Sequence, residues 1–228
     1  MTLKDQKLAI LWDMDGIIVD TKACHFFCWQ ETMTAFGYEL DKVVFEKNFG
    51  RKSRVVIPLY LGFDSDETLI NQILDDYRRR LMRLMLKKTN LVPGVISWLQ
   101  GFKDHHIPQV VASSAAMATL EKILSSYELL DYFEHIFAGA ELPAKPDPEI
   151  FLKGAKALGY APKNCCVIED SPAGVRAAKA AGMHCIAVTT TFSKSELSLA
   201  DAVIDDFTLP VNTVLDEMGI SYKTLNPA

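Results

Sequence analysis

The chain of 228 residues has no long apolar run, no C-x-x-C pair and no excess of basic residues. Without an apolar run of about 20 residues, we expect no membrane-spanning helix. The formal net charge of −5 argues against nucleic acid as a partner, because nucleic-acid-binding proteins present a basic face. Internal repeats and low-complexity tracts are absent, and a hydrophobic content of 49% is enough for an ordinary globular core.

The cysteines give no pattern that indicates disulfide bonds. Their number is odd, which speaks against a disulfide framework and favours a reducing cytoplasm. Cys24, His25 and Cys28 lie within one helical turn, but buried thiols are far commoner than an isolated metal site with three ligands. The amino-terminal segment MTLKDQK is polar and lacks the apolar core of a signal peptide. We therefore expect a cytoplasmic protein.

Short apolar runs alternate with helical patterns over most of the chain. The runs predict buried strands at residues 8–12, 107–113, 135–139, 165–170, 184–188 and 202–204. Helical patterns lie near residues 94–105, 116–126, 148–158 and 172–181. Continuous apolar strands alternating with helices are typical of a parallel sheet covered on both faces. The sequence predicts a doubly wound α/β fold.

Residues 20–90 interrupt this alternation and have helical patterns throughout. One helix opens at Asp20 or Thr21 and stops at Gly37, and another spans residues 69–84 with amphipathic spacing. The insert carries 12 Lys and Arg against 10 Asp and Glu, whereas the rest of the chain carries 12 against 19. We predict an α/β core of residues 1–19 and 91–228 with an α-helical insert at 20–90.

Two predicted strands end in pairs of acidic residues. Asp13 and Asp15 follow the first strand in WDMDG, and Glu169 and Asp170 end the strand CCVIED. Ligands of such sheets bind at the carboxyl ends of the strands. Neighbouring carboxylates repel unless a cation or proton lies between them, and oxygen ligands of this kind suit Mg²⁺. The acids predict a magnesium site.

Polar residues that suit phosphate follow two other strands. Ser113 and Ser114 end the strand IPQVVAS, where a hydroxyl beside backbone N–H groups is a usual phosphate contact, although serine also caps helices. Lys145 lies in AKPDPEIF, and its ammonium group is a suitable partner for phosphate and carboxylates. Each residue alone has an ordinary structural interpretation, but together with the acids they predict phosphate chemistry.

These residues resemble, in order and spacing, the four motifs of the haloacid dehalogenase superfamily, in its phosphatase and β-phosphoglucomutase-like branch. The motifs are WDMDG, the strand-ending Ser113, Lys145 in KPDPEIF, and IEDSPAGVRAAKAAG. The resemblance covers essentially the whole chain and implies that the insert is a cap that closes over the site.

The resemblance implies a role for each motif residue. Asp13 is expected to attack phosphorus and form an aspartyl-phosphate, with Asp15 as general acid and then general base. It implies Mg²⁺ on Asp13, the backbone carbonyl of Asp15 and Asp170, with Glu169 in or beside the coordination sphere. The phosphate-binding residues are expected to be Ser113, Ser114 and Lys145. Carbon–halogen hydrolysis is the less suitable activity, because a departing halide needs no proton from Asp15.

In the insert, His25 is expected either to steer Asp15 or contact substrate, or to serve packing alone. Arg51 and Arg54, in FGRKSR, are candidate anchors for a phosphate or carboxylate, with a solvated basic loop as the alternative. The run of three arginines at positions 78–80 is interpreted as a solvated face.

The sequence favours a monomeric, Mg²⁺-dependent phosphatase that hydrolyses a small phosphate monoester, such as a sugar phosphate. A hexose-phosphate mutase of the β-phosphoglucomutase type is the alternative. The loop from Ser114 to Met117 offers one hydroxyl and then apolar side chains, which disfavours the second phosphate anchor that a mutase needs. A non-catalytic binding module would be expected to have lost Asp13 or a metal carboxylate, and none is missing.

Overall fold

The computed structural model describes residues 8–63 and 65–220, so the polar segment 1–7 lies outside the described residues. The fold divides into two compact units. One, the core, contains the described chain up to Val19 and from Leu91 onward, and the other, the cap, contains Asp20–Asn90. Within residues 8–63 and 65–220, no helix is both long and apolar enough to cross a membrane.

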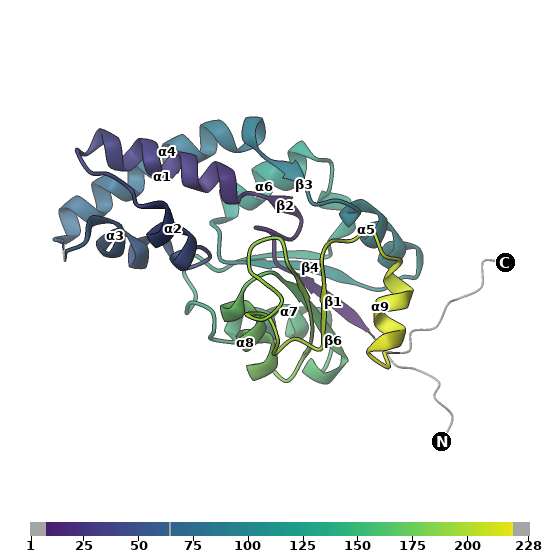
Figure 1. Cartoon of the computed structure of the whole chain (residues 1–228). Helices are drawn as coiled ribbons and strands as arrows, with labels where there is room; N and C mark the ends of the chain where they lie inside the picture. The colour runs from purple at the N-terminus through teal and green to yellow at the C-terminus, as the bar shows by residue number, and fades with distance from the viewer. Residues whose placement is uncertain (1–7, 64, 221–228) are drawn as a thin grey trace, which may run out of the picture. The chain divides into compact units, whose positions relative to one another are not determined.

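The core is built on a six-stranded sheet in which every pairing is parallel. Its strands in spatial order are β5 (His135–Ala138), β4 (Gln109–Ser113), β1 (Ala9–Trp12), β6 (Cys165–Glu169), β7 (His184–Val188) and β8 (Ala202–Ile204). The first strand of the sequence is thus central, between β4 and β6 (Figure 1). The doubly wound α/β fold expected from the sequence is confirmed.

Helices connect the parallel strands and cover the sheet. They are α5 (Val95–Asp104), α6 (Met117–Ser126), α7 (Glu149–Leu158), α8 (Pro172–Ala180) and α9 (Val211–Glu217), with short 3₁₀ turns η1 (Leu130–Tyr132) and η2 (Pro162–Asn164). Figure 1 shows α7 and α8 on one side of the sheet and α5 with α9 on the other. Two-sided covering explains why the strands are continuous apolar runs.

The two faces of β1 have different partners because successive side chains of a strand point to opposite sides. Leu11 belongs to the buried cluster that includes Phe151 of α7 and Val175 of α8. Trp12 faces the other layer, where its ring contacts Phe102 at 6.0 Å and Phe207 at 5.7 Å between centroids. Packing on both faces fixes the strand that leads into Asp13.

The cap consists of four helices and begins and ends next to two short strands. The helices are α1 (Lys22–Ala35), α2 (Lys42–Asn48), α3 (Ser53–Leu61) and α4 (Glu67–Lys88). The strands β2 (Val19–Asp20) and β3 (Asn90–Leu91) form a separate two-stranded sheet. Asp41 and Asp66 cap α2 and α4 by accepting hydrogen bonds from backbone N–H groups three residues later.

Aromatic side chains hold three of the cap helices together. Trp29 of α1 stacks on Tyr77 of α4 at 3.8 Å between ring centroids and meets Tyr60 of α3 edge-on at 5.2 Å. All three rings are buried. The cap therefore has a small hydrophobic core of its own, and the amphipathic pattern of residues 69–84 reports the buried side of α4.

Candidate active site

The site lies where β1, β4 and β6 end at the same edge of the core sheet. Asp13 follows β1 directly, and Ser113 and Glu169 are the last residues of β4 and β6. These strands are neighbours in the order β4-β1-β6, so the parallel topology brings their carboxyl ends together. All three side chains are buried, which is uncommon for polar residues without a role.

The loop after β1 carries both aspartates of the first motif. The backbone N–H of Asp13 donates to the carbonyl of Ile168 on β6 at 3.0 Å, which fixes the start of the loop. The carbonyl of Met14 then accepts from three N–H groups, those of residues 17, 18 and 19. The loop is therefore a tight turn.

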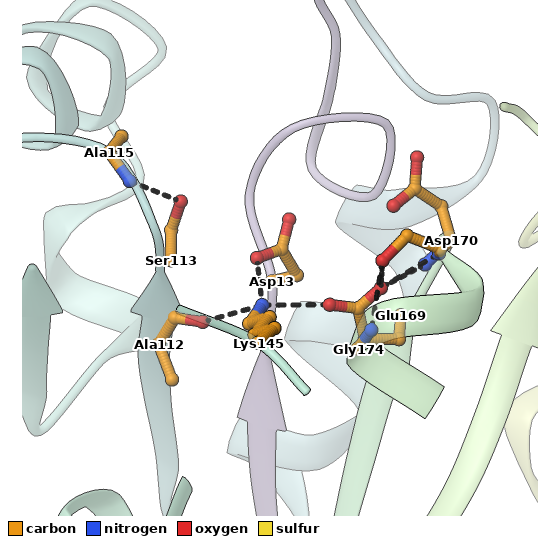
Figure 2. Close-up of polar contacts among 9 residues, drawn as sticks. Asp13, Ala112, Ser113, Ala115, Lys145, Glu169, Asp170 and Gly174 are labelled. Atoms are coloured by element: carbon orange, nitrogen blue, oxygen red, sulfur yellow. Dashed lines mark hydrogen bonds and ion pairs between the residues drawn. The ribbon is translucent and has the colours of Figure 1, made fainter. Parts of the chain in front are cut away.

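Lys145 is the cation at the centre of the site. Figure 2 shows its ammonium group between the carboxylates of Asp13 and Glu169, and its Nζ donates to Oδ1 of Asp13 at 2.6 Å and to Oε1 of Glu169 at 2.7 Å. The ammonium also lies 4.8 Å from the ring centroid of Phe151. Lys145 lies in the loop after β5, where a cis peptide joins it to Pro146. Lys145 thereby joins two strand ends.

Glu169 is held from both sides by hydrogen-bond donors of the core. Its Oε2 accepts from the backbone N–H of Asp170 and from both the N–H and the hydroxyl of Ser171, all at 2.8–2.9 Å. Its other oxygen accepts from Lys145. These contacts orient Glu169 toward Lys145, so we expect the residue to position the lysine, and its place in the metal site stays a prediction.

Asp170 presents the carboxylate atom best suited to a cation. Its side chain is buried, and Oδ2 has no hydrogen-bond partner of ordinary geometry within the described residues. Burial raises the pKa of Asp170 well above its ordinary value, and the charges of Glu169 and Asp13 raise it further. The arrangement is costly unless a positive charge compensates it.

The same conflict appears at Asp13. Burial raises its pKa to about 7; Lys145 opposes this effect, and the charges of Glu169 and Asp15 add to it. Burial acts to lower the pKa of Lys145, but the two carboxylates it touches outweigh burial and raise it. The lysine therefore remains charged, yet one ammonium group cannot compensate the acids around it.

These observations fit a divalent cation beside Asp13 and Asp170. Across the described parts of the chain, no group of three His, Cys, Asp or Glu side chains forms a metal site by itself. Mg²⁺ does not require one, since it commonly takes one or two carboxylates and completes its sphere with water and substrate phosphate. Such an ion would compensate the buried carboxylate of Asp170 and the raised pKa of Asp13.

The two serines differ in position. Ser113 is buried, and its hydroxyl accepts from the backbone N–H of Ala115 at 3.3 Å (Figure 2). Ser114 is half-buried in the loop before α6. Both lie at the strand edge next to Asp13, because β4 pairs with β1. The serine hydroxyls, nearby N–H groups and Lys145 together supply donors of the kind that bind phosphate.

Comparison with known proteins agrees with this geometry. Residues 10–188 match the family described as haloacid dehalogenase-like hydrolase. The chain belongs to this family. It is 32% identical to beta-phosphoglucomutase of Bacillus subtilis (strain 168) over 190 residues, covering 79% of this chain and 82% of that protein. It is 26% identical to hexitol phosphatase B of Escherichia coli (strain K12) over 217 residues, covering 91% and 96%.

A solved structure gives the same result for the fold. Beta-phosphoglucomutase from Clostridium difficile superimposes with a TM-score of 0.83 at 25% identity, covering 92% of this chain and 96% of that one. The resemblance of the sequence to the phosphatase and β-phosphoglucomutase-like branch is thus confirmed. As a haloacid dehalogenase-like hydrolase, the chain is an enzyme of phosphoryl transfer or hydrolysis.

The three candidate residues of the cap each have partners within the cap. His25 Nδ1 lies 2.5 Å from the hydroxyl of Tyr77. Arg51 donates to the side chain of Asn48 at 2.9 Å. The guanidinium of Arg54 donates to Glu67 and Asn71, which ties α3 to α4. Their roles toward substrate stay predictions.

Several supporting residues of this hydrolase gave no separate signal in the sequence. Ser171 caps α8, accepting from the N–H of Gly174 at 3.0 Å while its hydroxyl donates to Glu169. Gly174 is required there, because a Cβ would lie 1.7 Å from Glu169 Oε1. Thr190 donates its hydroxyl to the carbonyl of Gly16 at 2.5 Å. Small polar residues after strands are common, so only the fold distinguishes these from ordinary turn residues.

Proposed function

We propose that this hydrolase removes phosphate from a small phosphate monoester, with Mg²⁺ as cofactor and an aspartyl-phosphate intermediate on Asp13. The observation that carries the proposal is the position of Asp13: it is buried at a strand end with its Oδ1 held by Lys145. The side chain cannot serve as a solvated surface charge there. A fixed carboxylate beside an ammonium group and phosphate donors is suited to nucleophilic attack on phosphorus.

In the first step, an oxygen of Asp13 forms a bond to phosphorus as the bond from phosphorus to the ester oxygen breaks. Lys145 and the hydroxyl of Ser113 stabilise the negative charge on the phosphoryl oxygens. Because Lys145 also hydrogen-bonds to Glu169, its ammonium group is already oriented before substrate arrives. A preorganised donor does not have to be reoriented during the reaction.

Asp15 acts as the general acid and then as the general base of the reaction. Its carboxyl group donates a proton to the departing ester oxygen, so the product leaves as an alcohol. The resulting carboxylate then takes a proton from water, which attacks phosphorus, releases inorganic phosphate and restores Asp13. Asp15 is half-buried and lies two residues beyond the nucleophile in the same loop, so both carboxyl groups belong to the segment that follows β1.

The metal would be held by Asp13 and Asp170, together with a backbone oxygen of the loop after β1. A divalent cation there would supply charge that stabilises the phosphoryl group and keeps the nucleophile ionised. The residues around it have a separate task, which is to keep the two carboxylates in place. Glu169 does so indirectly, through Lys145 and through the backbone of Asp170.

For the substrate we propose a phosphorylated sugar or sugar alcohol. Two relatives support this class: beta-phosphoglucomutase from Bacillus subtilis and hexitol phosphatase B from Escherichia coli, each matched over more than three quarters of this chain. Selection of the sugar is assigned to the cap, where His25 and Arg51 are the candidate contacts. We also propose that the protein is cytoplasmic and monomeric.

A phosphomutase is the second candidate, and the 32% identity to beta-phosphoglucomutase favours it. A mutase must return the phosphoryl group to a sugar hydroxyl, so it has to bind a second phosphate. The loop after Ser113 offers one further hydroxyl, that of Ser114, and then the apolar residues 115–117. A desolvated phosphate with few donors binds poorly, and for this reason we place hydrolysis first.

The experiment is a panel of esters assayed for phosphate release with and without Mg²⁺. It contains glucose 6-phosphate, sorbitol 6-phosphate, β-glucose 1-phosphate, glycerol 3-phosphate and 4-nitrophenyl phosphate. A coupled assay for glucose 6-phosphate runs in parallel on β-glucose 1-phosphate with glucose 1,6-bisphosphate as primer. Release of phosphate faster than isomerisation supports the phosphatase; the reverse order makes the enzyme a mutase. Activity in neither assay would refute both.

A further inference from the structure

Three consecutive threonines follow β7, outside the four motifs, and each contacts a different part of the core. Thr189 donates its hydroxyl to Asp205, beyond β8, at 3.0 Å. Thr190 donates to the carbonyl of Gly16 at 2.5 Å. Burial raises the pKa of Asp170, and the hydroxyl of Thr191 acts to lower it. One short loop therefore contacts both the loop after β1 and the carboxylate after β6.

The contact with Gly16 is close because the backbone there leaves no room for a side chain. Gly16 has a φ of 76°, and a Cβ on it would lie 2.0 Å from Oδ2 of Asp170 and 2.8 Å from the hydroxyl oxygen of Thr191. Only glycine allows the backbone to pass so near to both residues. The result is that the carbonyl of Gly16 is brought to the hydroxyl of Thr190.

Gly16 is the residue directly after Asp15, so this contact bears on the proposed acid. Upstream, the loop is fixed where the N–H of Asp13 meets the carbonyl of Ile168 at 3.0 Å. Downstream, the N–H of Gly16 donates to the carbonyl of Val19 at 2.8 Å, which only ties the loop to itself. The bond from Thr190 is a side-chain contact that ties this far part of the loop to the end of β7.

From this geometry we propose that Thr190 is a positioning residue for Asp15, an inference that rests on the proposed function. By holding the carbonyl of Gly16, Thr190 sets where the preceding residue carries its carboxyl group. A general acid must lie within hydrogen-bond distance of the oxygen that it protonates, and a displacement of about 1 Å lowers the rate about 100-fold. Thr190 itself touches neither phosphorus nor the leaving oxygen in this assignment.

The test uses the need of the leaving group for a proton. A sugar or polyol oxygen leaves as a strongly basic alkoxide unless it is protonated, whereas 4-nitrophenolate leaves without help. In Thr190→Val, we expect kcat/KM for the best sugar or polyol phosphate of the panel to fall about 10- to 100-fold. For 4-nitrophenyl phosphate it should fall less than about 3-fold. The parameter kcat/KM is used because it reports the step in which the ester oxygen departs.

Two matched variants separate positioning from general damage to the loop. Thr190→Ser retains the hydroxyl and should restore the wild-type ratio between the two esters. Thr189→Val removes the neighbouring contact with Asp205 and should leave the ratio unchanged. Thermal unfolding of each protein checks folding, and if Thr190→Val does not fold, Thr190→Ala is measured instead.

The outcomes distinguish this inference from the proposal beneath it. An equal loss for both esters in Thr190→Val would show a merely structural residue and overturn the positioning role. An unchanged ratio with unchanged rates would do the same. If the wild type hydrolyses neither ester, the proposed phosphatase is refuted, and the role of Thr190 falls with it.

Discussion

The core and the cap treat their buried or half-buried charges in opposite ways. At the core's strand edge, Asp13 and Asp170 are buried among other acids, and burial together with like charge raises the pKa of both. In the cap, Asp76 of α4 also has little exposed surface, but it accepts hydrogen bonds from Arg80, Arg79 and Thr32. Burial acts to raise the pKa of Asp76, and these donors outweigh it, so the pKa is lowered.

The difference indicates what each group is for. A carboxylate with a lowered pKa is stabilised by its surroundings and in turn stabilises the fold at neutral pH. A carboxylate with a raised pKa destabilises the ligand-free protein, and such a group is retained where a substrate or an ion supplies the missing charge. The comparison assigns function to the acids of the core and stability to the acid of the cap, and each can be tested by removing one charge.

The largest effect is expected from Asp13→Asn. An amide cannot attack phosphorus as a carboxylate does, so turnover should fall by at least about 10⁴-fold. Because the change also removes a like charge from the site, the melting temperature measured in EDTA should not fall. Steady-state phosphate release and thermal unfolding on the same preparation provide both values.

Asp131→Asn, at an exposed position in η1, is the matched control and should behave as wild type in both measurements. Activity of Asp13→Asn near that of the control would remove this residue from the mechanism. A large loss of stability would instead remove the contrast between the acids of the core and of the cap.

The next effect concerns the metal. Chelation should abolish turnover and Mg²⁺ should restore it, while Ca²⁺ should inhibit because its looser coordination spoils the alignment of the reacting atoms. Binding has its own readout: Mg²⁺ at 100 times its dissociation constant stabilises the folded protein by about 2.7 kcal/mol. Asp170→Asn should lose most of this stabilisation.

Two variants make the metal experiment specific. Asp205→Asn, after β8, changes an acid that hydrogen-bonds to Thr189 and should keep the full response to Mg²⁺. Undiminished turnover after exhaustive dialysis against EDTA would contradict the assignment. So would an identical thermal shift for wild type and Asp170→Asn, because the buried oxygen of Asp170 is the feature to which the cation is assigned.

A smaller effect, of the opposite kind, is expected from Asp76→Asn. The cap loses a charged acceptor, so the free energy of unfolding at pH 7 should fall by about 1 kcal/mol, with little change in kcat. Urea denaturation and phosphate release measure the two. A fall in kcat with no loss of stability would contradict the comparison, because the acid of the cap would then be functional.

The pH dependence of this difference has a definite sign. The folded-state pKa of Asp76 is depressed, so its contribution is fully present above the unfolded pKa, near 3.8. The contribution is lost as pH falls through the lower, folded-state value. The difference in stability between wild type and Asp76→Asn should therefore be constant from about pH 5 to 7 and shrink below about pH 4. A difference that grows on acidification would contradict the lowered pKa.

Much of the fold and the main site residues followed from the sequence because they depend on local patterns. The six predicted core strands are all present, each within two residues of its predicted ends, and the helix ending before Gly37 begins after Thr21 as expected. Parallel topology then forces the acids of β1 and β6 to one edge. The short α9 was missed, because seven residues after Pro210 give too little periodicity.

What the sequence could not provide were contacts between residues far apart in the chain that share no pattern. Thr190 and Gly16 are 174 residues apart, and a threonine after a strand is unremarkable by itself. The hydrogen bonds of Glu169 with Lys145 and Ser171, and the ion pair of Arg54 with Glu67, likewise depend on side-chain directions that only the packed structure defines.

The smallest effect separates the two arginines of the cap loop. Arg54 donates to Glu67 and Asn71, so its charge is already paired between α3 and α4. The guanidinium of Arg51 instead donates to Asn48, three residues earlier in the same segment. Arg54→Gln should therefore lower stability by no more than about 0.5 kcal/mol and leave KM for the best sugar phosphate unchanged, because exposed ion pairs contribute little. Arg51→Gln serves as its partner variant and should raise KM with no loss of stability, as expected for an anchor that binds substrate and transition state equally. Urea denaturation and steady-state kinetics on the two proteins decide between them. A raised KM in Arg54→Gln, with Arg51→Gln unchanged, would reverse the assignment and make the ion pair with Glu67 the resting partner of a substrate-binding arginine.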